Sequence, residues 1–337
     1  MKKVLITGHL GYVGPIVTNL LDKEKIEWQG IDAGLFADRK SQTQYRDIRD
    51  LSLDDFKNIH SVIHLASLSN DPLGEVNKDL TETINFKETI RIAKLAKDAG
   101  VERFVFFSSC SVYGYSDREG ESLNEESPTR PLTAYAVSKL RSEEELVRLE
   151  DDNFLSVCLR FGTAYGVSPN MRSDLVVNNL MGTGFFNKKI EVLSDGTPWR
   201  PLIHVQDMAN AALAAVRVDR NLLKNRIFNV GSNVDNFQIK DIADVVSSLM
   251  PEIQVEIKGV TSSDNRSYCV DFSRFHTEVS PKFEWSLLKG SQEILDWLIK
   301  NKSIQNFLGS EEFVRVKKLR TLLEKNLFDE NLLYMRD

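Results

Sequence analysis

Val4-Leu5-Ile6-Thr7-Gly8-His9-Leu10-Gly11-Tyr12-Val13-Gly14, near the start of the chain, combines a short apolar run with three glycines at a spacing of three. Apolar residues then recur at helical spacing, at Ile16, Val17, Leu20 and Leu21. The pattern predicts a strand, a glycine turn and a helix. Such a turn lets the backbone approach a pyrophosphate, whose charge is stabilised by the free N–H groups and the dipole at the helix start. The spacing is Gly-x-x-Gly-x-x-Gly rather than Gly-x-Gly-x-x-Gly.

Acidic residues follow the next two predicted strands. Asp32 ends a short strand at 28–31, where a carboxylate accepts hydrogen bonds from the adenosine ribose and repels a 2′-phosphate, which favours NAD over NADP. Arg39 and Lys40 weaken that preference. Asp47 follows a predicted third strand, and it belongs either to a solvated turn or to a site that receives the adenine amino group.

Strands and helices alternate through the first half of the chain. Buried strands are predicted at 61–66, 103–107 and 155–161, with one or two helices at 77–100 and another at 134–150. Together with the first strands this makes about six alternating units, the pattern of a doubly wound parallel sheet. We therefore predict an α/β fold of the Rossmann type. Further strands are predicted at 201–205, 226–230, 253–257 and 267–270, and helices at 238–249 and 287–299.

Tyr135 and Lys139 stand four residues apart, so they lie on one face of the predicted helix. An ammonium one turn away favours the phenolate and lowers the pKa of a tyrosine, which can then accept a hydroxyl proton. The same spacing also occurs on solvated helix faces. Ser109 supplies a hydroxyl partner at the carboxyl end of a parallel strand, the end that faces the ligand crevice.

Composition excludes several classes of protein. The 337 residues include 42% hydrophobic residues and carry a net charge of −6, which argues against nucleic-acid binding but permits a local basic pocket. The three cysteines, Cys110, Cys158 and Cys269, are widely spaced, which predicts a reduced, cytoplasmic setting. No apolar run approaches the ~20 residues of a membrane span. The five histidines are scattered, so His64 is read as a core residue, and no metal is predicted.

The chain resembles the extended short-chain dehydrogenases/reductases, and within them the nucleotide-sugar epimerase/dehydratase branch. The resemblance rests on the order of these motifs: Gly8-x-x-Gly11-x-x-Gly14, Asp32, Asp47-Ile48, His64-Leu65-Ala66, Ser108-Ser109, Tyr113-Gly114, Tyr135-x-x-x-Lys139 and Arg200-Pro201-Leu202-Ile203-His204-Val205-x-Asp207. It implies catalysis by Ser109, Tyr135 and Lys139. It also implies that NAD is bound by Gly8, Gly11, Tyr12, Val13, Gly14, Asp32, Asp47, Ile48, Leu65, Ala66, Ser67, Asn85, Tyr135 and Lys139.

The resemblance further implies how the chain is divided. Residues 1–167 are expected to form the NAD-binding domain, with 200–235 returning to it. Residues 168–199 and 236–300 are expected to form a smaller, interleaved α/β substrate-binding domain. The tail at 301–337 exceeds the family's core and has apolar residues at helical spacing, so we expect a helical extension that packs on its own subunit or on a partner. We read Glu143-Glu144-Glu145 as a solvated helix face.

The implied substrate is a nucleotide-diphosphate sugar. Arg200 and Arg266 are predicted to bind the diphosphate, because a guanidinium holds phosphate oxygens bidentately, although both could be ordinary surface arginines. Ser109, Thr163 and Asn179 are predicted to contact the sugar. Thr163 stands where the family often has asparagine, which leaves the identity of the sugar open. Many relatives dimerise through the helix that carries the tyrosine, so a homodimer is expected by analogy.

The expected chemistry is oxidation of a sugar hydroxyl at C4 to a transient 4-keto sugar. Dehydratases of the family place carboxylates directly after the catalytic hydroxyl, where this chain has Cys110 and Ser111. Their absence favours a C4 epimerase. Three alternatives remain: an NAD(P)-dependent 4-ketosugar reductase, a C3/C5 epimerase or dehydratase that uses Cys110, and a dinucleotide-binding sensor without turnover.

Overall fold

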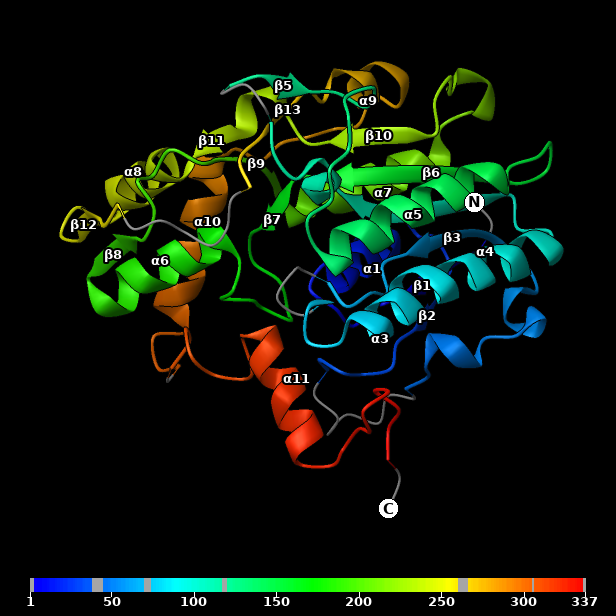
Figure 1. The fold of residues 1–337 in the computed structure, drawn as a ribbon, viewed down its shortest axis with the longest axis horizontal. Helices are drawn as coiled ribbons and strands as arrows, with labels where there is room; N and C mark the ends of the chain where they lie inside the picture. The colour runs from blue at the N-terminus through cyan, green and yellow to red at the C-terminus, as the bar shows by residue number, and fades with distance from the viewer. Residues whose placement is uncertain are drawn as a thin grey trace.

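A parallel six-stranded sheet forms the centre of the computed structural model, which describes residues 3–37, 45–69, 74–116, 120–259, 266–304 and 306–335. The strand order is β10-β6-β4-β3-β1-β2, so the order reverses beside β1 (Figure 1). In such sheets ligands bind outside the carboxyl ends of the strands, at the point of reversal. The strands are β1 (Lys3–Thr7), β2 (Trp28–Ile31), β3 (Ile59–His64), β4 (Arg103–Ser109), β6 (Leu155–Phe161) and β10 (Ile227–Val230).

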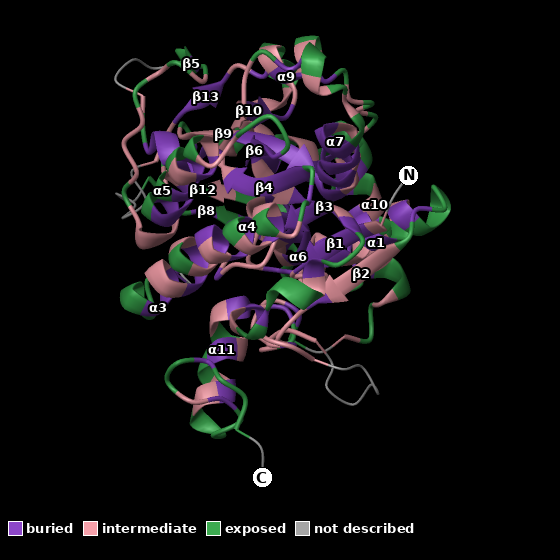
Figure 2. Ribbon diagram, turned by 90° about the vertical axis from the view of Figure 1, so that its right-hand side faces the viewer, coloured by how far each residue is buried: buried purple, intermediate pink, exposed green. Residues whose placement is uncertain are grey.

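Helices cover both faces of this sheet, and the apolar strands explain why. Side chains alternate along a strand, so Val4 and Ile6 enter one core and Leu5 enters the other. The first core is closed by α1 (Gly14–Lys23) and α7 (Val205–Arg217), and the second by α4 (Glu88–Asp98) and α5 (Ala134–Arg148). Burial is concentrated in the central strands (Figure 2), and the predicted doubly wound fold is confirmed.

The predicted helical region at 77–100 consists of α3 (Lys78–Glu82), a π-helical turn (Thr83–Lys87) and α4, which ends before Gly100. The predicted third strand before Asp47 is not seen in the described part of that segment, since residues 45–47 adopt no regular structure. The rest of that segment, with Arg39 and Lys40, lies outside the described residues.

Smaller sheets and helices lie beside the central sheet (Figure 1). β9 (Trp199–His204) pairs in parallel with β7 (Thr163–Tyr165) and antiparallel with β11 (Asn236–Gln238). β8 (Lys189–Val192) pairs with β12 (Gln254–Ile257), and β5 (Ser122–Leu123) pairs with β13 (Cys269–Val270). The helices here are α6 (Val176–Asn187), α8 (Ile239–Leu249), α9 (Ser273–Glu278) and α10 (Leu287–Lys300). In Figure 1, β8, β12, α6, α8 and α10 lie on the left, and β5, β13 and α9 lie along the top.

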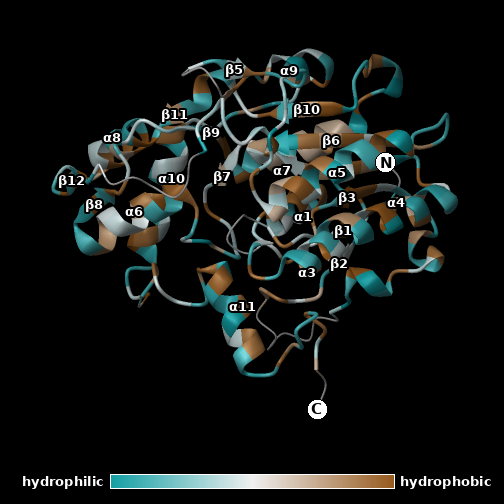
Figure 3. Cartoon of the chain, in the orientation of Figure 1, coloured by the Kyte–Doolittle hydropathy of each residue, from teal (hydrophilic) through white to brown (hydrophobic). Residues whose placement is uncertain are grey.

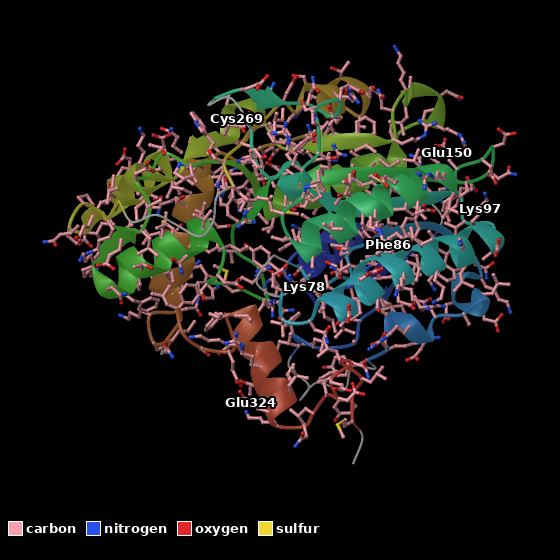
Figure 4. The ribbon with its side chains drawn as sticks, viewed as in Figure 1. Lys78, Phe86, Lys97, Glu150, Cys269 and Glu324 are labelled. Carbon is pink, nitrogen blue, oxygen red and sulfur yellow. The ribbon has the colours of Figure 1, made fainter. Side chains whose placement is uncertain are left out.

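The C-terminal segment contains α11 (Arg315–Glu324), whose end is marked by Glu324 in Figure 4, at the opposite end of the molecule from Cys269. Hydrophobic and hydrophilic residues alternate along this helix (Figure 3). Leu319, Leu322 and Phe328 join the same core as Ile48 of the N-terminal half of the chain. The extension therefore packs on its own chain. No helix among the described residues is long and apolar enough to cross a membrane.

Candidate active site

A cavity of about 830 Å³ opens at the carboxyl ends of β1, β3 and β4. Its wall combines residues from distant parts of the sequence: the glycine turn, the strand ends, the first turns of α5, the segment after β6, and the C-terminal helix. With one exception, all the predicted cofactor-binding and catalytic residues line this cavity: Gly8, Gly11, Tyr12, Val13, Gly14, Asp32, Asp47, Ile48, Leu65, Ala66, Ser67, Ser109, Tyr135 and Lys139.

The glycine turn has no room for side chains at two positions. Gly8 has a φ of +77°, and a Cβ there would lie 2.7 Å from the backbone nitrogen of Ala66. A Cβ on Gly14 would lie 2.4 Å from the carbonyl oxygen of His9. The first turn of α1 therefore faces the cavity with its backbone unobstructed. This cradle fits a dinucleotide pyrophosphate.

Asp32 is fixed at the end of β2 by two backbone hydrogen bonds. Its carboxylate oxygens accept from the N–H groups of Leu10, at 2.9 Å, and Gly34, at 2.7 Å. Burial raises the pKa of this carboxyl. Because it lies beside the glycine turn and lines the cavity, its position fits the predicted contact with a ribose.

Asp47 also lines the cavity, but its carboxylate already has a partner. Both oxygens accept hydrogen bonds from the Arg49 side chain, at 2.9 Å and 2.7 Å. Asn85 is the exception among the predicted cofactor residues. It is fully buried in the π-helical turn, where its side-chain oxygen accepts from the Leu68 N–H at 2.8 Å and its amide donates to the Leu68 carbonyl. Asn85 therefore supports a residue of the wall without lining the cavity.

The three predicted catalytic residues meet at this cavity. Ser109 ends β4, and its Oγ accepts from the Ser111 N–H at 3.1 Å. Thr133 caps α5 by accepting from the Ala136 N–H, which sets the start of the helix that carries Tyr135 and Lys139. The Lys139 Nζ lies 5.6 Å from the centre of the Tyr135 ring and donates to the Phe107 carbonyl at 2.7 Å. Burial lowers the pKa of Lys139 to about 7.

Glu143, one turn beyond Lys139, is fully buried, so the prediction of a solvated face was wrong for this residue. Its carboxylate accepts from Arg160 at 2.7–3.0 Å and from the Ser108 hydroxyl. Arg160 also donates to the Tyr113 hydroxyl at 3.0 Å. The reason is helical geometry: residues 139 and 143 share the face of α5 that packs on the sheet, where Arg160 compensates the charge. Glu144 is exposed, as predicted.

Cys110 points away from the cavity. Its side chain is 1% exposed within an apolar cluster, and its Sγ donates to the Arg160 carbonyl at 3.2 Å. Burial raises the pKa of this thiol. Ser111, in contrast, lines the cavity with a buried hydroxyl that has no hydrogen-bond partner. The structure therefore argues against the alternative in which Cys110 acts as an acid or base.

The predicted substrate residues Thr163, Asn179, Arg200 and Arg266 also line the cavity. Arg200 donates to the backbone carbonyls of Trp199, at 2.8 Å, and of Arg266, which brings the two arginines together across 66 residues of sequence. Asn179 lies in the first turn of α6 and donates to the Ser173 carbonyl at 3.0 Å.

Sequence reasoning missed several lining residues: Arg172, Asp174, Tyr268, Arg315 and Leu332. Arg172 and Asp174 form a salt bridge at 2.7 Å. The signals available in the sequence were weak, since none of these residues belongs to a recognisable motif.

His64 is a core residue, as predicted. It is fully buried and shares hydrogen bonds with Thr7, at 2.7 Å, and Thr89, at 2.9 Å, and burial lowers its pKa to about 3. In the part of the chain that the structure describes, no three His, Cys, Asp or Glu side chains are grouped so that they could hold a metal ion.

The parallel sheet, the glycine cradle and the Tyr135–Lys139 pair define a dinucleotide-dependent enzyme. Residues 4–231 match the model of the NAD dependent epimerase/dehydratase family, so the chain belongs to that family and uses NAD. The chain is 27% identical to a UDP-glucose 4-epimerase of Yersinia pestis, covering 88% of this chain and 98% of the relative. It is 25% identical to a UDP-glucuronate 4-epimerase of Thermodesulfobacterium geofontis, covering 72% and 73%.

A solved structure, MoeE5 in complex with UDP-glucose and NAD, is similar over 89% of this chain and 99% of that chain. The TM-score is 0.77 and the sequence identity is 26%. The predicted family, fold, cofactor and enzyme class are therefore confirmed.

Proposed function

We propose that the protein is an NAD-dependent nucleotide-sugar epimerase that acts at C4 through a transient 4-keto intermediate. The observation that carries the proposal is the composition of one cavity, where Ser109, Tyr135 and Lys139 lie with the dinucleotide cradle and with Arg200 and Arg266. The names of the relatives, which are 4-epimerases of UDP-sugars, support the same reaction.

Each catalytic residue has a task that its surroundings explain. Tyr135 accepts the proton of the C4 hydroxyl, and the Lys139 ammonium stabilises the phenolate that this requires. Ser109 donates a hydrogen bond to the oxygen that becomes the carbonyl. When bound, NAD would supply the hydride acceptor and donor for C4. Inversion at C4 would result when the keto sugar presents its opposite face, and Tyr135 would give the proton back to the C4 oxygen.

The other wall of the cavity supplies substrate binding. Arg200 and Arg266 offer guanidinium groups to the two phosphates, and Thr163 and Asn179 offer short polar side chains to the sugar. The turn after Ser109 carries a buried thiol and a hydroxyl in place of carboxylates, so elimination next to the ketone has no dedicated base on this turn. These features favour epimerisation over dehydration.

Isotope incorporation tests the proposal. The purified protein is incubated in heavy water with UDP-glucose, UDP-glucuronate, their C4 epimers and, with added NADH or NADPH, their 4-keto derivatives, and product stereochemistry and mass are determined. We expect a C4 epimer without carbon-bound deuterium, because the hydride never exchanges with solvent. Carbon-bound deuterium would mean enolisation beside the ketone and would contradict the mechanism. Turnover only of 4-keto substrates with added NADH or NADPH would establish the reductase.

The expected homodimer and cytoplasmic location stay predictions. α5 exposes Val137, which is 40% accessible, on the helix that the family uses for dimerisation. Light scattering of the purified protein measures the mass and tests the dimer directly.

A further inference from the structure

Arg315 opens the C-terminal helix α11 and is 3% exposed, yet it lines the dinucleotide cavity. One of its Nη atoms donates to the Asn170 carbonyl at 3.1 Å. Asn170 in turn donates from its amide to the Leu10 carbonyl of the glycine turn at 2.6 Å. The guanidinium is therefore positioned, through one intervening residue, beside the turn that fits a pyrophosphate.

The Arg315 guanidinium forms no ion pair with any acid of the described residues, although a second arginine lies close by. That neighbour, Arg172, is paired with Asp174. Burial, followed by the charge of Arg172, lowers the pKa of Arg315 to about 10, so it remains a cation at neutral pH. The charges of Asp174 and Asp32 raise the pKa of Arg315 in part, but among the described residues neither carboxylate forms an ion pair with the guanidinium. A buried cation that is not directly paired is unfavourable, and proteins normally compensate it with an anion.

The C-terminal segment is held against the cavity by contacts with the nucleotide-binding half. Arg49 donates to the carbonyls of Asn331, at 2.7 Å, and Leu332, at 3.1 Å, while Asp47 holds the same guanidinium. The Arg315 guanidinium also stacks 4.5 Å from the centre of the Phe36 ring, just beyond β2. These contacts place the cation between the glycine turn and the segment that follows β2, and the Asp47 carboxylate holds Arg49 in place.

We propose that Arg315 is a cofactor-binding residue contributed by the C-terminal extension, and that its guanidinium pairs with the pyrophosphate of bound NAD. A guanidinium can donate N–H groups to two phosphate oxygens at once, and this one lines the cavity beside the glycine turn. The inference concerns cofactor binding alone, so it stands or falls independently of the reaction at C4.

Binding measurements on the full-length protein test this assignment. Bound nucleotide is removed from wild type, Arg315→Met and Arg315→Lys, and dissociation constants are measured for NADH, NADPH, ADP-ribose and adenosine. Arg320→Met is the matched control, because Arg320 is an exposed arginine of the same helix. We expect Arg315→Met to bind NADH and ADP-ribose about tenfold to a hundredfold more weakly, the range for a charged hydrogen bond, with adenosine unchanged. Arg315→Lys should be intermediate, and the control should equal wild type.

Three outcomes would overturn the proposal. Unchanged ADP-ribose affinity in Arg315→Met would remove Arg315 from the pyrophosphate site. Equal weakening of adenosine would show that Arg315 only shapes the pocket. Weakening confined to NADPH would assign the guanidinium to a 2′-phosphate. Thermal unfolding of the nucleotide-free variants shows whether each variant is folded. If Arg315→Met does not fold, the ADP-ribose affinity of Arg315→Lys is compared with that of Arg320→Met instead.

Discussion

Replacing Lys139 with Met should abolish turnover and yet stabilise the nucleotide-free protein at neutral pH. Burial lowers the pKa of the Lys139 ammonium from 10.5 to about 7. At about 1.4 kcal/mol per pH unit, keeping this charge in the core destabilises the folded protein by roughly 5 kcal/mol. Methionine removes that cost but loses the hydrogen bond to the Phe107 carbonyl, worth about 1.5–3 kcal/mol. We expect a net gain of about 2 kcal/mol at pH 6.

The pH dependence of the stability difference between wild type and Lys139→Met follows from which state binds the lysine proton. Below pH 7 the folded and unfolded states both carry the charged lysine, so the wild type bears the full cost of burying it. Between pH 7 and 10.5 the folded state has released the proton while the unfolded state still binds it, so wild-type stability rises with pH. The advantage of Lys139→Met should therefore fall by about 3 kcal/mol between pH 6 and pH 9.5.

Urea unfolding of the nucleotide-free proteins at pH 6, 8 and 9.5, followed by circular dichroism, measures this difference. Lys94→Met on α4 is the matched control, because Lys94 is exposed and its replacement should change stability by less than about 0.5 kcal/mol at each pH. A stability difference between wild type and Lys139→Met that stays constant from pH 6 to 9.5 would refute the assignment of a buried, strained charge to Lys139.

Three further predictions concern residues in or next to the site. Tyr135→Phe should lower turnover by about 10²–10⁴-fold, as expected for lost proton transfer, with NADH affinity unchanged; substantial residual activity would exclude Tyr135 as the base. Cys110→Ser should keep turnover within about twofold of wild type in a steady-state assay, because the thiol is buried away from the cavity. A Cys110→Ser variant that is folded but inactive would support the mechanism in which Cys110 acts as an acid or base. Glu143→Gln should lower the free energy of unfolding, measured in urea, by about 3–5 kcal/mol, because it leaves Arg160 unpaired. Glu144→Gln, on the exposed face, should lower it by less than about 0.5 kcal/mol. Equal effects of the two substitutions would contradict the buried ion pair.

Much of the fold could be predicted because the strands carry strong local signals. Runs such as Phe104-Val105-Phe106-Phe107 are buried on both faces in a parallel sheet, so they are continuously apolar and easy to recognise. The glycine turn was equally easy to recognise, because neighbouring backbone atoms lie so close to Gly8 and Gly14 that no side chain fits there. The strand expected before Asp47 is not seen in the described residues 45–47, and that segment has no apolar periodicity to support one.

The candidate site was predictable where a residue type and its spacing imply a chemistry. Tyr135 and Lys139 share a helix face by virtue of the four-residue interval, and Ser109 lies at a strand end that must face the crevice. Asn85 was misplaced because its support of Leu68 depends on the π-helical turn, which no local pattern indicated.

The order of strands and helices, the glycine cradle and the predicted catalytic residues could be read from local sequence, because each prediction depends on residues within one element or one turn. The directions of Cys110 and Glu143, and the place of Arg315 in the cavity wall, follow only from packing between elements. A buried carboxylate and an exposed one look identical in the run Glu143-Glu144, and only Arg160, on a neighbouring strand, distinguishes them. Likewise, α11 begins 301 residues after Gly14, and it reaches the cavity only because the chain folds back over it.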